Sequence, residues 1–172
     1  RWFMMVCTPL EGAEGGVVVS QTEITERIAA DNKVRQVMRV HALRGQISRA
    51  IVKNRNHQSL WQAVCRAAVE FGWFRMAWIG TEGASTGQIR PVARAGHEDG
   101  FLASLSDQAD GGIDAAVLPR PGADLVTTTD ITLDHPLAAW REAALQRGYH
   151  ASATVLFTVD ETAFGSLHLF SA

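Results

Sequence analysis

The sequence predicts an α+β fold in which helices flank a central antiparallel β-sheet, with a long helix ahead of it. Three observations lead to this expectation. Residues 24–53 lack proline and are rich in good helix formers, which predicts one long helix. Residues 74–79 are almost wholly apolar, as in a central strand covered on both faces. Residues 150–159 and 163–171 are two strand-like runs joined by a polar turn, which predicts an antiparallel hairpin.

The composition is that of an ordinary globular protein, with 172 residues, 47% of them hydrophobic and 20% charged. The formal net charge of -2 supplies no basic footprint, so we expect no nucleic acid partner and no membrane contact by this segment. The most apolar window, 67–80, is shorter than the roughly 20 residues of a membrane span. The two cysteines, Cys7 and Cys65, have no CxxC spacing, and we expect both to be buried thiols in a cytoplasmic protein.

The first part of the chain predicts a hairpin followed by the long helix. Residues 1–9 alternate loosely, and a turn-rich stretch separates them from the run Val17–Val19. Within the helix, four apolar residues have the a/d spacing of a two-stranded coiled coil, which predicts a homodimer through this helix. The alternative is that the helix packs this stripe on its own sheet. The four residues are Val40, Leu43, Ile47 and Ala50.

The remaining elements follow in order. Asn56 is a suitable N-cap for a second helix, which ends near Gly72. Residues 89–95 alternate but contain Pro91, which predicts an edge strand. We then expect a short helix over 97–105, a helical turn over 114–118 and a strand over 125–130. A last helix is expected to open at Asp134–Pro136 and to end at Gly148.

No arrangement of residues in the sequence indicates catalysis. There is no nucleophile elbow, no phosphate-binding glycine loop and no pair of histidines at helical metal-site spacing. We therefore expect no catalytic residues, no metal site and no enzymatic activity.

Between Phe74 and Tyr149 four blocks occur in order: FRMAWIG, PVARAGHEDGFL, TTTDITLDHPLAAW and REAALQRGY. With these blocks, residues 56–172 resemble the GAF sensory domain of bacterial multidomain signalling proteins of the diguanylate cyclase, phosphodiesterase or sensor histidine kinase type. Residues 1–22, followed by Glu23-Ile24-Thr25-Glu26-Arg27, resemble the closing hairpin and exit motif of a PAS domain. The resemblance implies a PAS remnant over 1–22, a signalling linker helix over 23–55 and a GAF domain over 56–172 that lacks its closing helix. It also implies the GAF-like (PAS/GAF/profilin-like) form of the α+β fold.

The resemblance further implies a ligand pocket between the sheet and the helix and loop that cross it. Trp140 and Tyr149 have aromatic faces with polar tips, which suit a flat or cationic ligand. The lid offers no cysteine, as reductase or bilin-attaching relatives would need, so the ligand and any cofactor stay unknown. We expect a small-molecule sensor that relays ligand state to an output domain; the alternative is a dimerisation and relay module with a filled pocket. The implied lining is Met76, Trp78, Phe101, Asp130, His135, Leu137, Trp140, Tyr149 and Ser152.

Overall fold

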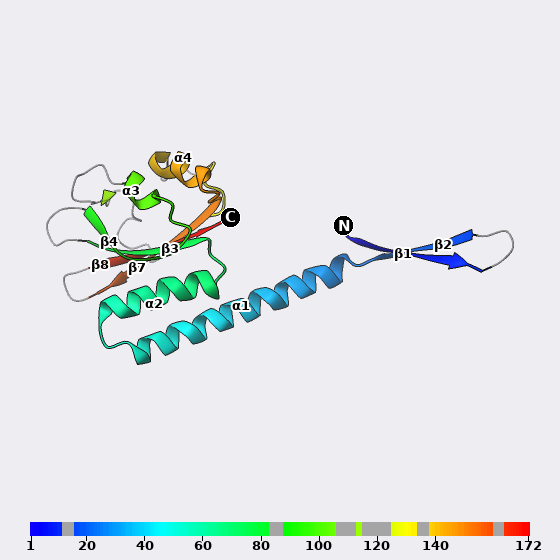
Figure 1. Ribbon diagram of the computed structural model, residues 1–172, viewed down its shortest axis with the longest axis horizontal. Helices are drawn as coiled ribbons and strands as arrows, with labels where there is room; N and C mark the ends of the chain where they lie inside the picture. The colour runs from blue at the N-terminus through cyan, green and yellow to red at the C-terminus, as the bar shows by residue number, and fades with distance from the viewer. Residues whose placement is uncertain (12–15, 83–87, 106–112, 115–124, 134–137, 160–163) are drawn as a thin grey trace. The chain divides into compact units, whose positions relative to one another are not determined.

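The computed structural model describes residues 1–11, 16–82, 88–105, 113–114, 125–133, 138–159 and 164–172. The chain divides into two compact units, Arg1–His41 and Ala42–Ala172 (Figure 1). Helix α1, Thr25–Lys53, confirms the long helix expected from the sequence. Within the described residues no helix is both long and apolar enough to cross a membrane.

The first unit contains a two-stranded antiparallel sheet. Strands β1 (Phe3–Leu10) and β2 (Gly16–Glu23) pair in register, with Cys7 opposite Val19. The Trp2 amide donates to Thr25 Oγ1 at 2.9 Å, and this bond ties the start of β1 to the start of α1. Cys7 is exposed, so the expectation of a buried thiol at this position is wrong. The reason is that the described residues of this unit place no further strand against the hairpin, which leaves its side chains open to solvent.

The second unit is built on a six-stranded antiparallel sheet of order β5-β4-β3-β8-β7-β6. This arrangement confirms the predicted α+β class and places the apolar strand β3 between two neighbours, β4 and β8. The strands are β3 (Met76–Glu82), β4 (Gln88–Gly96), β5 (Ile113–Asp114), β6 (Leu125–Thr128), β7 (Ala151–Thr158) and β8 (Phe164–Ser171).

Strand β4 is an edge strand over most of its length. The short β5 pairs only with Gln88 and Ile89, and Pro91 lies opposite Gly80 at a register shift, a kind of position where sheets tolerate proline. Beyond this point helix α2 covers the edge: the side-chain amides of Gln58 and Gln62 donate to the carbonyl oxygens of Val92 and Arg94 at 2.6 and 2.8 Å. Covering these carbonyls blocks pairing with a further strand.

Helices cover both faces of this sheet (Figure 1). Helix α2 (His57–Glu70) begins at the predicted N-cap Asn56, whose Oδ1 accepts from the Ser59 amide at 2.8 Å. It packs on one face over a core that includes Cys65, which is fully buried as expected. Helices α3 (Phe101–Leu105) and α4 (Ala138–Gln146) lie on the opposite face over a second core.

Some of the expected boundaries differ from the structure, and others cannot be compared with it. Helix α3 begins later than predicted, because Asp99 and Gly100 have positive φ and cannot belong to a helix. The Glu98 carboxylate instead accepts from the Leu102 amide at 2.8 Å and caps the helix. Asp114 lies in β5, whereas 115–118 and the helix start at 134–136 lie outside the described residues.

Candidate ligand-binding site

The sheet face under α3 and α4 carries the residues that sequence reasoning assigned to a pocket. Because directly paired residues of an antiparallel sheet point to the same face, the register brings distant residues together. Trp78 of β3 pairs with His168 of β8, which in turn pairs with Thr154 of β7. Two residues away on the same face, Met76 pairs with Phe170, which pairs with Ser152.

Five of the predicted lining residues form a packed aromatic and apolar cluster. The ring of Phe101 meets those of Trp140 and Tyr149 edge-on, at centroid distances of 6.4 and 5.3 Å. A third edge-on contact, at 5.2 Å, joins Phe101 to Phe170. Such arrangements are favourable for aromatic rings and fill the space between sheet and helices. Met76, Trp78, Phe101, Trp140 and Tyr149 are all between 0% and 4% exposed.

His168 is the polar centre of this face. Its ring stacks on Trp78, with centroids 4.0 Å apart and planes 6° apart. Thr154 Oγ1 lies 3.1 Å from Nδ1, and Ser166 Oγ lies 3.0 Å from Nε2. Burial lowers the pKa of His168 to about 3, so the imidazole is neutral near pH 7. A neutral ring has one donor and one acceptor nitrogen, so one hydroxyl donates to it and the other accepts from it.

Trp78 carries a buried hydrogen-bond donor, the N–H of its indole ring. Within the described part of the chain, its indole Nε1 has no hydrogen-bond partner and is closed off from solvent. Leaving a buried donor unpaired costs about 1 to 3 kcal/mol. Native interiors pair nearly all such groups, so an exception calls for an explanation, such as a water or an ion bound at the site.

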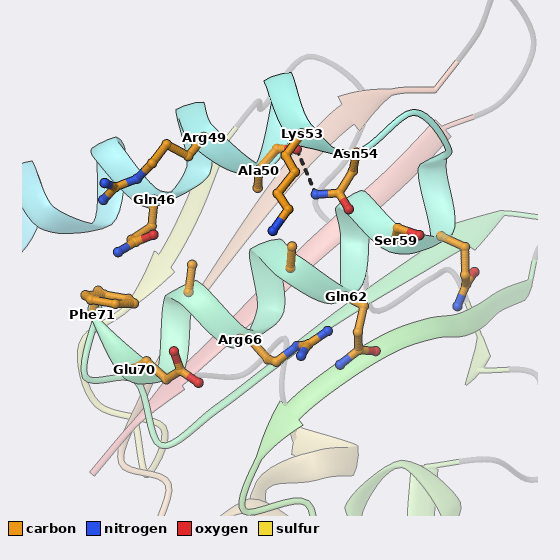
Figure 2. Close-up of a pocket in the computed structure, with 13 residues that line it drawn as sticks. Gln46, Arg49, Ala50, Lys53, Asn54, Ser59, Gln62, Arg66, Glu70 and Phe71 are labelled. Carbon is orange, nitrogen blue, oxygen red and sulfur yellow. Dashed lines mark hydrogen bonds between the residues drawn. The ribbon is translucent and has the colours of Figure 1, made fainter.

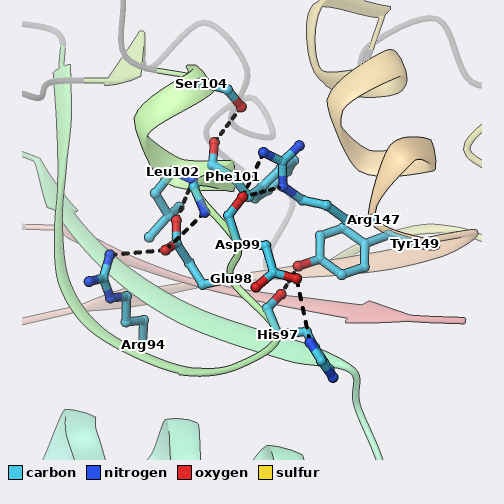
Figure 3. A network of polar contacts seen from close by, with 10 residues as sticks. Arg94, His97, Glu98, Asp99, Phe101, Leu102, Ser104, Arg147 and Tyr149 are labelled. Atoms are coloured by element: carbon cyan, nitrogen blue, oxygen red, sulfur yellow. Dashed lines mark hydrogen bonds and ion pairs between the residues drawn. The ribbon is translucent and has the colours of Figure 1, made fainter.

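A second polar network holds the helices over the face (Figure 3). The Tyr149 hydroxyl donates to the carbonyl oxygen of His97, and burial raises the pKa of Tyr149 to about 12. Arg147 donates from Nε and Nη2 to the Asp99 carbonyl oxygen at 3.0 and 2.8 Å. The Tyr149 hydroxyl, which was expected to hold a ligand, is therefore bonded to the loop before α3. Through this bond Tyr149 links the end of α4 to that loop.

The other predicted lining residues differ in their positions. Asp130 is exposed, and its Oδ1 accepts from the hydroxyl and amide of Thr132, which lowers the pKa of Asp130. It shapes a turn rather than facing the aromatic cluster. Ser152 is half-buried on the same sheet face as His168. His135 and Leu137 lie outside the described residues.

Sequence reasoning did not select His168, Thr154 or Ser166 for the site. For Ser166 and His168 the sequence of β8 contained an indication. There Ser166, His168 and Phe170 alternate with Gly165, Leu167 and Leu169. A histidine between small polar and aromatic residues at period two indicates one sheet face. Its partner Thr154 could be found only with the β7–β8 register. Among the described residues no group of three or more His, Cys, Asp or Glu side chains is placed to hold a metal ion.

The residues predicted for a dimer contact are spread between exposed and buried positions on α1. Val40 is 59% exposed, whereas Ala50 is 8% exposed. Leu43 and Ile47 are half-buried. Ile47 lines an apolar groove of about 440 Å³ together with Leu60, Trp61 and Val64 of α2. Part of the stripe is therefore shielded inside its own unit.

No protein-family model matches this sequence, and no curated protein matches it. Solved structures do share its architecture. The A. aeolicus nlh2 GAF domain, in an inactive state, has a TM-score of 0.55 at 8% identity, over 80% of this chain and 81% of that chain. A GAF domain from a Coxiella burnetii phosphoenolpyruvate-protein phosphotransferase has a TM-score of 0.52 at 14% identity, over 79% of each chain.

The chain has a GAF fold. The GAF-like form implied by the sequence resemblance is therefore confirmed. The same fold occurs in a free methionine-R-sulfoxide reductase from Neisseria meningitidis, solved with its substrate, at a TM-score of 0.53 and 10% identity, over 80% of this chain and 75% of that chain. Since GAF folds serve more than one purpose, function must be argued from the residues of the site.

Proposed function

We propose that this chain is a small-molecule-sensing regulatory domain of a bacterial signal-transduction protein. It binds its ligand on the sheet face under α3 and α4 and relays ligand state through α1 to an output domain. It acts without catalysis, in the cytoplasm. In this proposal residues 1–22 are the closing hairpin of a PAS domain, and the parent protein is of the cyclic-di-GMP or histidine kinase signalling type.

The observation that carries the proposal is the buried Trp78 Nε1, which has no hydrogen-bond partner among the described residues and belongs to a ring stacked on neutral His168. A ligand with a hydrogen-bond acceptor satisfies this donor, and its apolar part takes the place of core side chains around it. Because these aromatics pack together in the structure, ligand entry requires them to move. The bonds from Tyr149 to His97 and from Arg147 to Asp99 join the two helices over the site, so they move as one layer.

A metabolite screen by thermal shift tests this proposal on wild type, Trp78→Phe and the surface control Trp73→Phe. A ligand at 100 times its dissociation constant stabilises the folded state by about 2.7 kcal/mol. We expect Trp78→Phe to abolish this stabilisation, because phenylalanine places a smaller aromatic ring at this position and removes the N–H. The control, whose native side chain is 66% exposed, retains it. Equal ligand stabilisation in all three proteins contradicts the role of Trp78.

The alternative is a structural dimerisation and relay module with a filled pocket. The edge-on packing of Phe101 against three other rings favours it, because such a core needs no ligand. If no metabolite shifts the wild type and Trp140→Ala lowers stability by about 3 to 5 kcal/mol, the relay function is the better description.

Both the sensor function and the relay alternative include dimerisation through α1. The contact we propose uses Val40, which is exposed, with Leu43, Ile47 and Ala50 along the same stripe. Light scattering over a concentration series measures the dimer, and Val40→Asp with Leu43→Asp is expected to give a monomer. An unchanged dimer in that variant places the contact elsewhere.

A further inference from the structure

The charges of this chain are unevenly distributed. Residues 32–69 contain eight of its 16 Lys and Arg residues and none of its 18 Asp and Glu residues. The stretch runs from α1 through the turn after Lys53 and along most of α2. The near-neutral total therefore conceals a cationic helical hairpin within an otherwise acidic protein.

Three of these cations line a cleft of about 880 Å³ between the C-terminal end of α1 and the length of α2, here called the α1–α2 cleft (Figure 2). Arg49 and Lys53 extend from α1, and Lys53 points across toward α2, from which Arg66 extends. Each helix contributes residues at i, i+3, i+4 and i+7 spacing, so one continuous stripe of each faces the cleft. Apart from the three cations, the residues of these two stripes are Gln46 and Ala50 of α1 and Ser59, Gln62, Ala63, Ala67 and Glu70 of α2.

The side chains of the α1–α2 cleft that remain available to a partner are mainly cationic. Arg49, Lys53 and Arg66 are exposed, and in the described part of the chain none of them forms an ion pair. Two neighbouring amides are already used, since the side chain of Gln62 donates to the Arg94 carbonyl oxygen of β4 and Asn54 Nδ2 donates to the Ala50 carbonyl oxygen at 2.8 Å. Glu70, a carboxylate lining the cleft, lies at its Phe71 end.

The shape of the cleft fits a helix. Ala50, Ala63 and Ala67 form its base, and small side chains allow a third helix to approach two others closely. Arg49 and Lys53 are one turn apart, which matches carboxylates at i and i+4 of a partner helix. We propose that the α1–α2 cleft is a docking site for an acidic α-helix of a partner protein.

Charge and shape disfavour other occupants. A second copy of the chain that docked here through its own cleft would bring the same cations together and would be repelled. Duplex nucleic acid is bound by protein elements that project into its grooves, whereas this feature is concave. Membrane-surface helices bury large apolar residues beside their cations, and the cleft instead combines its cations with alanines and amides.

A helical probe peptide tests the proposal on the full chain. The probe has about 20 residues, is alanine-rich and carries glutamates at i, i+4, i+7 and i+11, with a glutamine version as its control. We expect the glutamate peptide to bind by fluorescence anisotropy and to weaken as salt is raised, while the glutamine peptide does not bind. The triple variant Arg49→Gln, Lys53→Gln, Arg66→Gln is expected to lose roughly tenfold or more in affinity.

Two matched variants separate docking in the cleft from diffuse attraction. The triple variant Arg27→Gln, Lys33→Gln, Arg35→Gln removes the same charge from exposed α1 positions outside the cleft and is expected to retain binding. Ala63→Met fills the base without changing charge and is expected to weaken binding. Equal loss in both triple variants, or unchanged binding in Ala63→Met, overturns the proposal. So does tighter binding to duplex DNA or to phosphatidylserine vesicles, absence of peptide binding, or a dimer that the cleft variant abolishes. Circular dichroism checks that each variant is folded.

Discussion

Trp78 and His168, ninety positions apart in the sequence, stack face to face at a centroid distance of 4.0 Å. The contact places an imidazole where no water reaches it, between Thr154 and Ser166. A charged ring in this position would lose its hydration, so the folded protein holds His168 neutral.

Protonation of His168 therefore links stability to pH. The pKa of His168 is about 3 in the folded chain, against about 6.5 for an ordinary histidine in the unfolded chain. Between these values the unfolded chain binds a proton that the folded chain does not, so stability falls as the pH drops below about 6.5. One such group contributes a slope of at most roughly 1.4 kcal/mol per pH unit. Urea unfolding at pH 7.5, 6 and 5 should show a larger loss in wild type than in His168→Gln; parallel losses would contradict this.

The Tyr149 hydroxyl is expected to serve stability. Tyr149→Phe removes its bond to the His97 carbonyl oxygen, and we expect a loss of about 1 to 3 kcal/mol in urea unfolding. Because Tyr149 is the only tyrosine, its ionisation can be followed directly by ultraviolet absorbance and should occur near pH 12 in the folded protein. Phenolate formation near pH 10 under native conditions would show that the ring is not buried.

Two glycine substitutions should have opposite effects. Gly45→Ala in α1 is expected to raise stability by about 0.5 to 1 kcal/mol, since the added Cβ meets nothing closer than Arg49 Nη2 at 4.0 Å. Gly96→Ala should destabilise by more than that, because φ is 90° and its Cβ would lie 2.3 Å from the Arg75 carbonyl oxygen. Thermal unfolding of both variants measures the two signs; a stabilising Gly96→Ala would contradict the β3–β4 geometry.

The two thiols should react at very different rates. Cys7 is exposed, whereas Cys65 is fully buried and burial raises its pKa to about 12. A disulfide reagent at pH 8 is expected to modify one thiol at once and the other only after denaturant is added. Cys7→Ser should remove the fast reaction and Cys65→Ser should leave it. Rapid modification of the Cys7→Ser protein would mean that α2 opens readily.

Sequence reasoning succeeded where structure follows local periodicity. The unbroken run of helix formers predicted α1, and the cap at Asn56 with its apolar spacing predicted α2. Strand β3 was predicted because a continuous apolar run this short is typical of a buried strand, whereas a buried helix is usually longer. The start of α3 was missed, because the carboxylate of Glu98 and two positive φ values at Asp99 and Gly100 decide it.

The site was predicted less well, because its geometry depends on strand pairing. Trp78 was selected from its own strand, but its partner His168 follows only from the β3–β8 register. No periodicity tells whether an aromatic such as Trp140 lines a space or fills one, since this depends on packing between elements. The cationic cleft was missed for another reason: the total charge was considered without its distribution along the chain.

The pairing of β3 with β8 also has a consequence for synthesis. Met76 lies near the beginning of the second unit and Phe170 at its end, so the centre of the sheet joins strands that leave the ribosome far apart in time. Until β8 emerges, one side of the apolar strand β3 has no partner. Folding of this unit must therefore wait until β8 has been translated. Until then, the edge of β3 that will pair with β8 is unpaired, and a nascent chain needs protection from aggregation there.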